Sequence, residues 1–400
     1  MSSRTDATSP LEPTHGSGQA VRAGVVTAVV GFTSSFAVVL TGLTAVGASA
    51  AEAASGLFVL SLTMGLGSVL FSLRTRTPVT LAWSTPGAAL LAGAVAPDGG
   101  YATAVGAFVV AGLLYVLTGF FSPLARLVRA IPLALANAML AGVLLVLCVA
   151  PFRALVDEPT AVGPVLLTWL VLMRVARRWA VPGAFATAVV VIIVTGSLSA
   201  VEAADVVPHL TWTTPGFDAA TVLAIGVPLY LVTMTSQNIP GAAVLASFGY
   251  DAPLRPVLLY SGAATAATAG LGGYSINLAA ISAALAAGPT AHPDPDRRWV
   301  AGVSTGATYL ALGPLAAAVA AVAVAAPAGL VAAVAGVALL GTFGSAAASA
   351  LGDEGHREAA ALTFVVAASG VAVAGVGAAF WSLLAGGAYL LLMHRRRPSP

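Results

Sequence analysis

The sequence predicts an all-α integral membrane protein with about 14 transmembrane segments, arranged as two inverted repeats of seven. Of its 400 residues, 58% are apolar and 8% are charged, whereas about a quarter of the residues in a soluble domain are charged. The mean hydropathy of +0.96 extends over the whole length, so the apolar residues do not form a single anchor. The two halves also resemble each other at an offset of about 190–200 residues.

The composition excludes several classes of function. All 17 basic residues are arginine, and a chain without lysine has no P-loop and no Schiff-base site. A net charge of +2 without a long basic stripe argues against nucleic-acid binding. Continuous apolar runs such as 315–326 exclude an outer-membrane barrel. Any energy that the protein uses must then come from an ion or substrate gradient, and we expect no cofactor and no metal.

Residues 1–21 are rich in Ser, Thr and Pro and are expected to form a disordered cytoplasmic tail. Apolar segments bounded by Pro, Gly and charge then follow. Those of the first repeat are 22–47, 52–73, 78–95, 101–121, 124–150, 161–176 and 181–200. Those of the second repeat are 219–247, 254–271, 273–288, 297–323, 328–350, 357–374 and 377–394.

The third and tenth segments are short and polar, so hydropathy alone would count about 12 spans. The arginines favour 14, because Lys and Arg are retained on the cytoplasmic side of a membrane. If all segments cross from a cytoplasmic N-terminus, every arginine except Arg153 lies inside. If the third does not cross, Arg74 and Arg76 share a face with Asp98. We therefore expect a bacterial inner-membrane protein with both termini cytoplasmic, including a tail over 395–400.

The same two segments predict a binding site. Segment 78–95 contains Trp83-Ser84-Thr85-Pro86, and segment 273–288 contains Tyr274-Ser275-Ile276-Asn277. In each, a few extended residues precede a helix of small residues, which is typical of discontinuous spans. Because seven is odd, the repeats enter the membrane with opposite orientation. Paired broken segments of this kind indicate the substrate site of a secondary transporter.

Three motifs carry a resemblance to a known family: TMTSQNIPG at 233–241, GYSINLAAISAA at 273–284, and AFW at 379–381. On these motifs the chain resembles the benzoate/proton symporters (BenE family) from about residue 22 to 394. The layout is more distantly similar to that of nucleobase carriers with seven-plus-seven inverted repeats. That likeness implies a core domain of 22–121 and 219–323, and a gate domain of 124–200 and 328–394.

An anionic substrate is expected on physical grounds as well. Half-helices that begin near Thr85 and Asn277 would turn free N–H groups toward a carboxylate. Trp83, Tyr274 and Phe36 are expected to flank a flat ring, and the amides of Gln237 and Asn238 can donate without bringing charge into lipid. The predicted substrate residues are Ser34, Phe36, Trp83, Ser84, Thr85, Gln237, Asn238, Tyr274, Ser275, Ile276 and Asn277.

Each of these residues also has a structural interpretation. Trp83 is compatible with an interfacial aromatic belt, and Gln237 and Asn238 with bonds to a neighbouring helix. Asn277 is compatible with a simple helix cap, and Ser34 with helix packing. The sequence Gly302-Val-Ser304-Thr-Gly306 matches a nucleophile elbow, but inside an apolar segment it predicts a GxxxG packing face instead.

Proton coupling lacks an obvious carrier. Nucleobase carriers have acidic residues on the eighth and tenth segments, where this sequence has Gln237 and Ile276. Glu52 is the nearest candidate for proton coupling, and its alternative is a solvated loop charge. A weak aromatic acid that carries its own proton would need no titratable side chain for proton coupling.

The leading hypothesis is a secondary carrier, not an enzyme, that moves benzoate or a similar aromatic carboxylate with protons by alternating access. Its partners would be that substrate, protons and the lipid bilayer, with a homodimer left open. The alternatives are the same fold carrying a nucleobase or another small anion, and an anion channel.

The arginine distribution generates a test of topology. In a Cys148→Ala background, Asp98→Cys should react with an impermeant thiol reagent from outside the cell, whereas Arg178→Cys should not. The model with about 12 spans exchanges the sides of these positions. Labelling at position 178 but not at 98 would remove the case for 14 spans.

Overall fold

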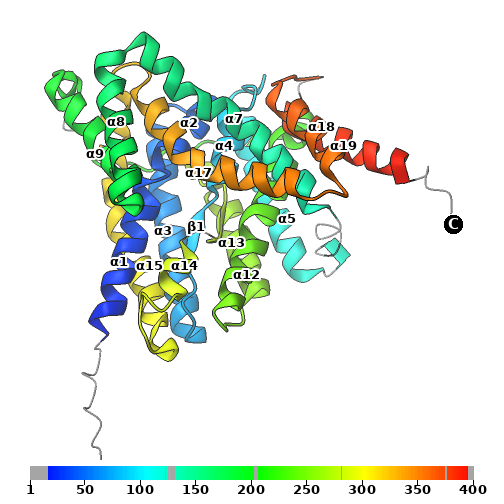
Figure 1. Cartoon of the computed structure of the whole chain (residues 1–400), viewed down its shortest axis with the longest axis horizontal. Coiled ribbons are helices and arrows are strands. Elements are labelled where there is room, and N and C mark those ends of the chain that lie inside the picture. Colours follow the sequence, from blue (N-terminus) through cyan, green and yellow to red (C-terminus); the bar gives the residue numbers. More distant parts are fainter. Residues whose placement is uncertain are drawn as a thin grey trace, which may run out of the picture.

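The computed structural model describes residues 17–121, 123–124, 126, 131–201, 206–280, 282–373 and 376–394. Its described part is helical apart from one two-stranded antiparallel sheet and a single isolated bridge (Figure 1). Eight helical stretches in this part are long and apolar enough to cross a membrane. The expected all-helical membrane protein is therefore confirmed. The C-terminal tail 395–400 and most of the N-terminal tail lie outside the described residues.

The first half of the chain contains eight helices and one strand among its described elements. These are α1 (Gly18–Thr33), α2 (Phe36–Ala45), α3 (Ala50–Thr75), β1 (Leu81–Trp83), α4 (Thr85–Ala92), α5 (Tyr101–Phe120), α7 (Leu133–Asp157), α8 (Pro159–Val175) and α9 (Ala180–Val194). Short 3-10 turns cover Arg177–Trp179 and Ser197–Ala200. Helix α1 begins at Gly18, a turn earlier than the predicted segment at 22.

The second half contains ten α-helices and one strand among its described elements. Its elements are α10 (Ala219–Thr221), α11 (Val227–Thr233), α12 (Ile239–Ser247), α13 (Leu254–Thr268), β2 (Ile276–Leu278), α14 (Ala283–Ala287), α15 (Trp299–Leu312), α16 (Ala316–Val324), α17 (Leu330–Gly352), α18 (Arg357–Ala368) and α19 (Ala378–His394). The π-helical stretches Val222–Gly226 and Met234–Asn238 join α10, α11 and α12. Further 3-10 turns cover Ala269–Leu271, Pro295–Arg297 and Gly313–Leu315.

Helix α7 differs from the predicted range 124–150, because it begins at Leu133 and continues through Pro151 to Asp157. A proline inside a helix removes one hydrogen bond and usually kinks or ends it. Here its ring packs on α17, where a Cβ on Gly336 would lie 2.3 Å from Pro151 Cγ. The glycine leaves room for the ring, so the helix accommodates the proline.

Strands β1 and β2 join the two halves of the chain. They pair antiparallel, with Leu81 opposite Leu278 and Trp83 opposite Ile276. The pairing extends past the strands, since Ser84 N donates to Ser275 O at 3.1 Å and Ala279 N donates to Thr80 O at 2.9 Å. Backbone groups inside a membrane protein need internal partners, and here each extended segment supplies them to the other.

The largest helix contacts fall into two sets, which we call packing groups, and contacts of α17 with α2 and of α4 with α7 connect them. In one, α15 contacts α1 and α3, α13 contacts α5, and α4 contacts α2. In the other, α7 contacts α17 and α18, α8 contacts α9, and α18 contacts α19. Figure 1 shows α7 and α17 side by side above α3, α13 and α14, with α8 and α9 at one end and α18 and α19 at the other.

Glycines allow α15 to approach α3 closely. A Cβ on Gly306 would lie 2.5 Å from the carbonyl oxygen of Gly65, and one on Gly302 would lie 2.2 Å from Ser72 Oγ. Between them, Ser304 Oγ donates to Val21 O at 2.9 Å, on an exposed face of the helix. The packing interpretation of this motif is confirmed, because small residues let membrane helices approach backbone to backbone.

Glu52 anchors the linker between the halves. Its carboxylate accepts bonds from Ser49 N at 2.8 Å and Ser49 Oγ at 2.7 Å. Glu52 N in turn donates to Ser49 Oγ at 3.3 Å, which completes a capping box at the start of α3. Thr213 Oγ1, in the linker, donates to the other carboxylate oxygen. Nearby, Thr211 N donates to Ser55 Oγ at 3.1 Å. Glu52 therefore holds the polypeptide that enters the second repeat.

The contact between α3 and α15 generates a stability prediction. Gly306→Ala should destabilise the protein by about 1–3 kcal/mol, because the methyl group would overlap the Gly65 carbonyl. Thermal unfolding in detergent measures the change. Gly344→Ala is the matched control, because no atom lies within 4 Å of its Cβ position and alanine favours the helix. Equal melting temperatures for Gly306→Ala and the native protein would contradict this account.

Candidate functional site

A cavity of about 150 Å³ lies where both packing groups meet. Its walls come from the α1–α2 break, the β1–α4 junction, the π-helical stretch before α12, the start of α14, and α15 and α17. The polar side chains that line it, together with Trp83, are Ser34, Ser35, Thr85, Gln237, Ser282, Tyr309 and Thr342. None of the described side chains on its walls is acidic, basic or histidine.

The break between α1 and α2 positions Trp83. At this break Ser35 Oγ donates to Gly31 O at 2.9 Å and accepts from Trp83 Nε1 at 2.7 Å. The indole also packs on Phe32, with ring centroids 5.3 Å apart. Since its N–H is bonded and its ring is supported, Trp83 presents a fixed aromatic surface to the cavity.

Helix α4 begins at the cavity wall. Ser84 is its N-cap, and Ser84 Oγ accepts from Gly87 N at 3.0 Å. Pro86 has no N–H, so Thr85 carries the remaining free N–H at this end, and both residues line the cavity. The positive end of the helix dipole therefore faces the cavity without any basic side chain.

Two tyrosines fix the strand crossing from behind. Tyr274 Oη donates to Ser84 O at 2.6 Å, and Tyr115 Oη lies 3.0 Å from Ser275 Oγ. Ser84 Oγ lies 2.6 Å from Thr233 Oγ1 on α11. All of these side chains are buried. The network connects the start of α4 to three other elements by hydrogen bonds, so this helix end is held in place relative to them.

Gln237 and Asn238 have different surroundings although they are neighbours. Asn238 Oδ1 accepts from Leu278 N at 3.0 Å, so this amide supports β2. The Gln237 side chain lines the cavity and makes no hydrogen bond to a described residue. The π-helical stretch 234–238 sets this arrangement, and such stretches are frequent at functional sites.

Several other lining groups also lack a partner in the described part of the chain. They are the hydroxyl groups of Ser34, Thr85, Ser282, Tyr309 and Thr342. Gly31 makes room for one of them, because a Cβ there would lie 2.5 Å from Tyr309 Oη. With the Gln237 amide, the cavity offers neutral hydrogen-bonding groups beside an aromatic wall, which suits a partly apolar ligand with one polar end.

The structure brings together four of the predicted substrate residues, which are Ser34, Trp83, Thr85 and Gln237. Six others, Ser84, Asn238, Tyr274, Ser275, Ile276 and Asn277, lie behind the wall and hold the strands and helix ends in place. Phe36 faces a smaller neighbouring cavity. The lining residues Ser282, Tyr309 and Thr342 are not among the predicted ones. Ser282 is a single polar residue among small apolar ones, whereas Tyr309 follows Thr308 and Thr342 lies between Gly341 and Phe343.

The expected cap at Asn277 is wrong. Asn277 lies in β2 opposite Ala82, and its Nδ2 donates to Leu278 O at 2.9 Å. Helix α14 begins six residues later, at Ala283, with Ser282 at the N-cap position. The extended stretch is longer than expected because residues 275–279 pair with residues 80–84. Glu52 likewise lies outside the cavity walls, in its capping box.

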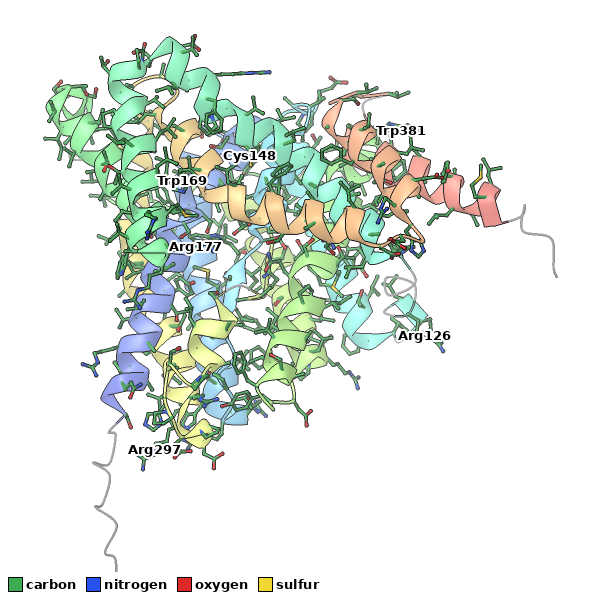
Figure 2. All side chains as sticks on the ribbon, viewed as in Figure 1. Arg126, Cys148, Trp169, Arg177, Arg297 and Trp381 are labelled. Atoms are coloured by element: carbon green, nitrogen blue, oxygen red, sulfur yellow. The ribbon has the colours of Figure 1, made fainter. Side chains whose placement is uncertain are left out.

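The peripheral position of charge agrees with a neutral cavity. Figure 2 shows Arg126 and Arg297 at the edge of the molecule, away from the α2, α4 and α17 region. Arg298 is buried near the same end as Arg297, where it donates to the carbonyl oxygens of His292, Ala287 and Pro293. Arg298 thus stabilises a loop and does not line the cavity.

Comparison with known proteins identifies relatives over nearly the whole chain. The chain is 39% identical to inner membrane protein YdcO of Escherichia coli (strain K12) over 379 residues, covering 93% of this chain and 95% of that protein. It is 29% identical to the benzoate membrane transport protein of Acinetobacter baylyi over 340 residues, covering 85% and 86% of the two chains.

Solved structures with a similar fold are transporters. The transmembrane domain of the cyanobacterial bicarbonate transporter BicA matches with a TM-score of 0.58 at 15% identity, covering 92% of this chain and 97% of that one. The mouse anion transporter Slc26a9, in its inward-facing state, matches with a TM-score of 0.61 at 11% identity, covering 96% and 69%. At such identities the likeness concerns the fold alone.

The family comparison covers the elements that build the cavity. The benzoate membrane transport protein family, BenE, matches residues 15–392, which include every wall of the cavity and both packing groups. Its members and the structural neighbours are transporters and not enzymes. This chain is a multi-pass membrane protein that belongs to the BenE family of benzoate membrane transport proteins.

Proposed function

We propose that this protein is a secondary active transporter for benzoate or a similar aromatic carboxylate, with the cavity beside Trp83 as its substrate site. The observation that carries the proposal is the combination of a fixed aromatic wall with unpartnered neutral donors. A cavity of about 150 Å³ is large enough in other proteins to hold a benzene ring. The name of the Acinetobacter relative supports the same substrate.

The carboxylate would lie between the Gln237 amide, the Tyr309 hydroxyl and the start of α4 at Thr85. Each offers an N–H or O–H that lacks a partner within the described chain. Hydrogen bonds to a charged group are stronger than those between neutral groups, so a few such donors can replace a basic residue. The ring would then pack against Trp83.

The proposed transport cycle moves the two packing groups against each other. We assign 22–121 and 219–323 to a core domain, and 124–200 and 328–394 to a gate domain, with 14 crossings and cytoplasmic termini. The cavity supports this division, because Ala338 and Thr342 of α17 face lining residues of the other group. A site shared by two groups of helices can open to either side when one moves, as in alternating access.

The proton would travel on the substrate rather than on a side chain. The described lining residues hold no carboxylate or imidazole that could carry it. A primary amide has one acceptor and two donors, so Gln237 can bind a carboxylate and can also form two bonds with a protonated carboxyl group. An inorganic anion is the second candidate substrate, supported by the names of the bicarbonate and anion transporters that share the fold.

Uptake of labelled benzoate into proteoliposomes tests the proposal. The native protein should accumulate benzoate in a saturable manner under an inward pH gradient. Gln237→Ala should weaken benzoate binding by about 1.5–3 kcal/mol, because one charge-assisted hydrogen bond is lost. That change corresponds to at least about a tenfold rise in Kd, which calorimetry on the purified protein can measure.

Asn137→Ala is the matched control for Gln237→Ala. Asn137 also carries an amide on a long helix, but it bonds Ser349 Oγ at 2.8 Å and does not line the cavity. Its benzoate affinity should equal that of the native protein. Large non-saturating currents would point to a channel, and native benzoate affinity in Gln237→Ala would place the site elsewhere.

Glu52 provides a separate test of the coupling mechanism. Glu52→Gln should retain pH-driven benzoate uptake, because this carboxylate caps α3, accepts a hydrogen bond from Thr213 and does not line the cavity. Its thermal stability should fall as the capping box weakens. Uptake with and without a pH gradient, compared with substrate exchange, measures the effect. Loss of pH dependence with intact exchange would make Glu52 the coupling residue.

A further inference from the structure

Two further cavities lie along the seam between α2 and α17, beyond the substrate cavity. The nearer one has a volume of only about 20 Å³ and lies beside Phe36, Phe185 and Val334. The farther one, of about 360 Å³, lies where α2 ends and α17 begins. We call the nearer one the constriction and the farther one the vestibule.

Helices α2 and α17 pass all three spaces in order. Ser35, the N-cap of α2, borders the substrate cavity, and within α2 Phe36 borders the constriction and Leu40 the vestibule. Along α17, which contacts α2, the matching residues are Ala338, Val334 and Ala332. The three spaces therefore lie in order along one line between the two packing groups, which we call the path, and the constriction is the smallest of them.

An aromatic pair closes this path. Phe36 on α2 meets Phe185 on α9 edge to face, with ring centroids 4.6 Å apart and an interplanar angle of 66°. Phe36 also stacks on Phe32 at 6.1 Å, and Phe32 packs on Trp83 at 5.3 Å. A continuous line of aromatic rings thus leads from the wall of the substrate cavity to the closure.

The chemistry of the constriction differs from that of the substrate cavity. Every side chain that lines it is Phe, Ala, Ile, Leu or Val. In the vestibule, the Thr41 and Thr44 hydroxyls bond carbonyl oxygens of their own helix, Ala37 O at 2.8 Å and Leu40 O at 2.9 Å. A hydrated inorganic ion would lose its water on entering the constriction, where no lining side chain offers a hydrogen-bond donor, and the cost in free energy would be high. Apolar constrictions of this kind exclude water and ions.

We propose that Phe36 and Phe185 form an apolar barrier that selects organic carboxylates with a ring over inorganic anions. The inference rests on the proposed function, because it assumes that substrates leave the cavity along this seam. An aromatic ring can replace the Phe36–Phe185 contact with contacts of its own as the packing groups separate. Chloride or bicarbonate has no apolar surface to offer in exchange.

Anion flux into liposomes that contain the full chain tests the barrier directly. A halide-sensitive dye reports chloride entry in the absence of benzoate, and labelled benzoate reports transport. Phe185→Ala should raise chloride entry several-fold over the native protein, while Phe185→Leu should stay closed because leucine keeps the constriction apolar and filled. Benzoate affinity of Phe185→Ala, measured by calorimetry, should be unchanged, since Phe185 does not line the substrate cavity.

Phe58→Ala is the matched control, because Phe58 is a half-buried phenylalanine of α3 that borders neither the constriction nor the vestibule. If Phe185→Ala is not monodisperse, Phe36→Ala removes the other half of the pair. Chloride entry at the native rate in a monodisperse variant would overturn the barrier, as would equal leakage in Phe58→Ala. Absence of benzoate binding in the native protein would instead refute the proposed function and leave the chloride result valid.

Discussion

The demand that every backbone polar group inside a membrane protein finds a partner underlies this structure. Two short extended segments interrupt the helices, and each would expose a row of N–H and C=O groups if it were alone. Their antiparallel pairing, from Leu81–Trp83 to Ile276–Leu278, satisfies the groups of each segment that face the other. The Asn238 amide and the Ser68 hydroxyl, which accept from Leu278 N and Leu81 N, satisfy groups at the margins. Irregular backbone is tolerated here because the protein itself surrounds it.

This pairing determines where the chemistry lies. It directs the start of α4 at the cavity and turns Trp83 toward Ser35, while the side chains of Tyr274 and Tyr115 lock the crossing from behind. The cavity obtains its polarity from helix ends, hydroxyl groups and one amide. Such groups are less costly than charges in a low-dielectric region, and they serve a substrate that brings its own charge.

Local signals in the sequence account for much of the architecture and for part of the candidate site. Long apolar runs identify the helices, and Trp83, Thr85 and Gln237 are recognisable as polar or aromatic interruptions of them. The partner of Trp83 and the true start of α14 depend on pairing between distant segments, which no local pattern encodes. Tyr309 and Thr342 are not predictable from the sequence, because helix packing determines which face of α15 and which face of α17 lines the cavity.

The pairing of β1 with β2 also has a consequence for biosynthesis. The first strand leaves the ribosome long before the second, since they belong to opposite halves of the chain. Contacts between residues so distant in sequence form late and slow folding. Until Ile276–Leu278 is made, the segment around Leu81–Trp83 needs the translocation machinery, lipid headgroups or water to cover its backbone. Truncated chains that end before Ile276 should therefore fold poorly and be degraded by quality-control proteases.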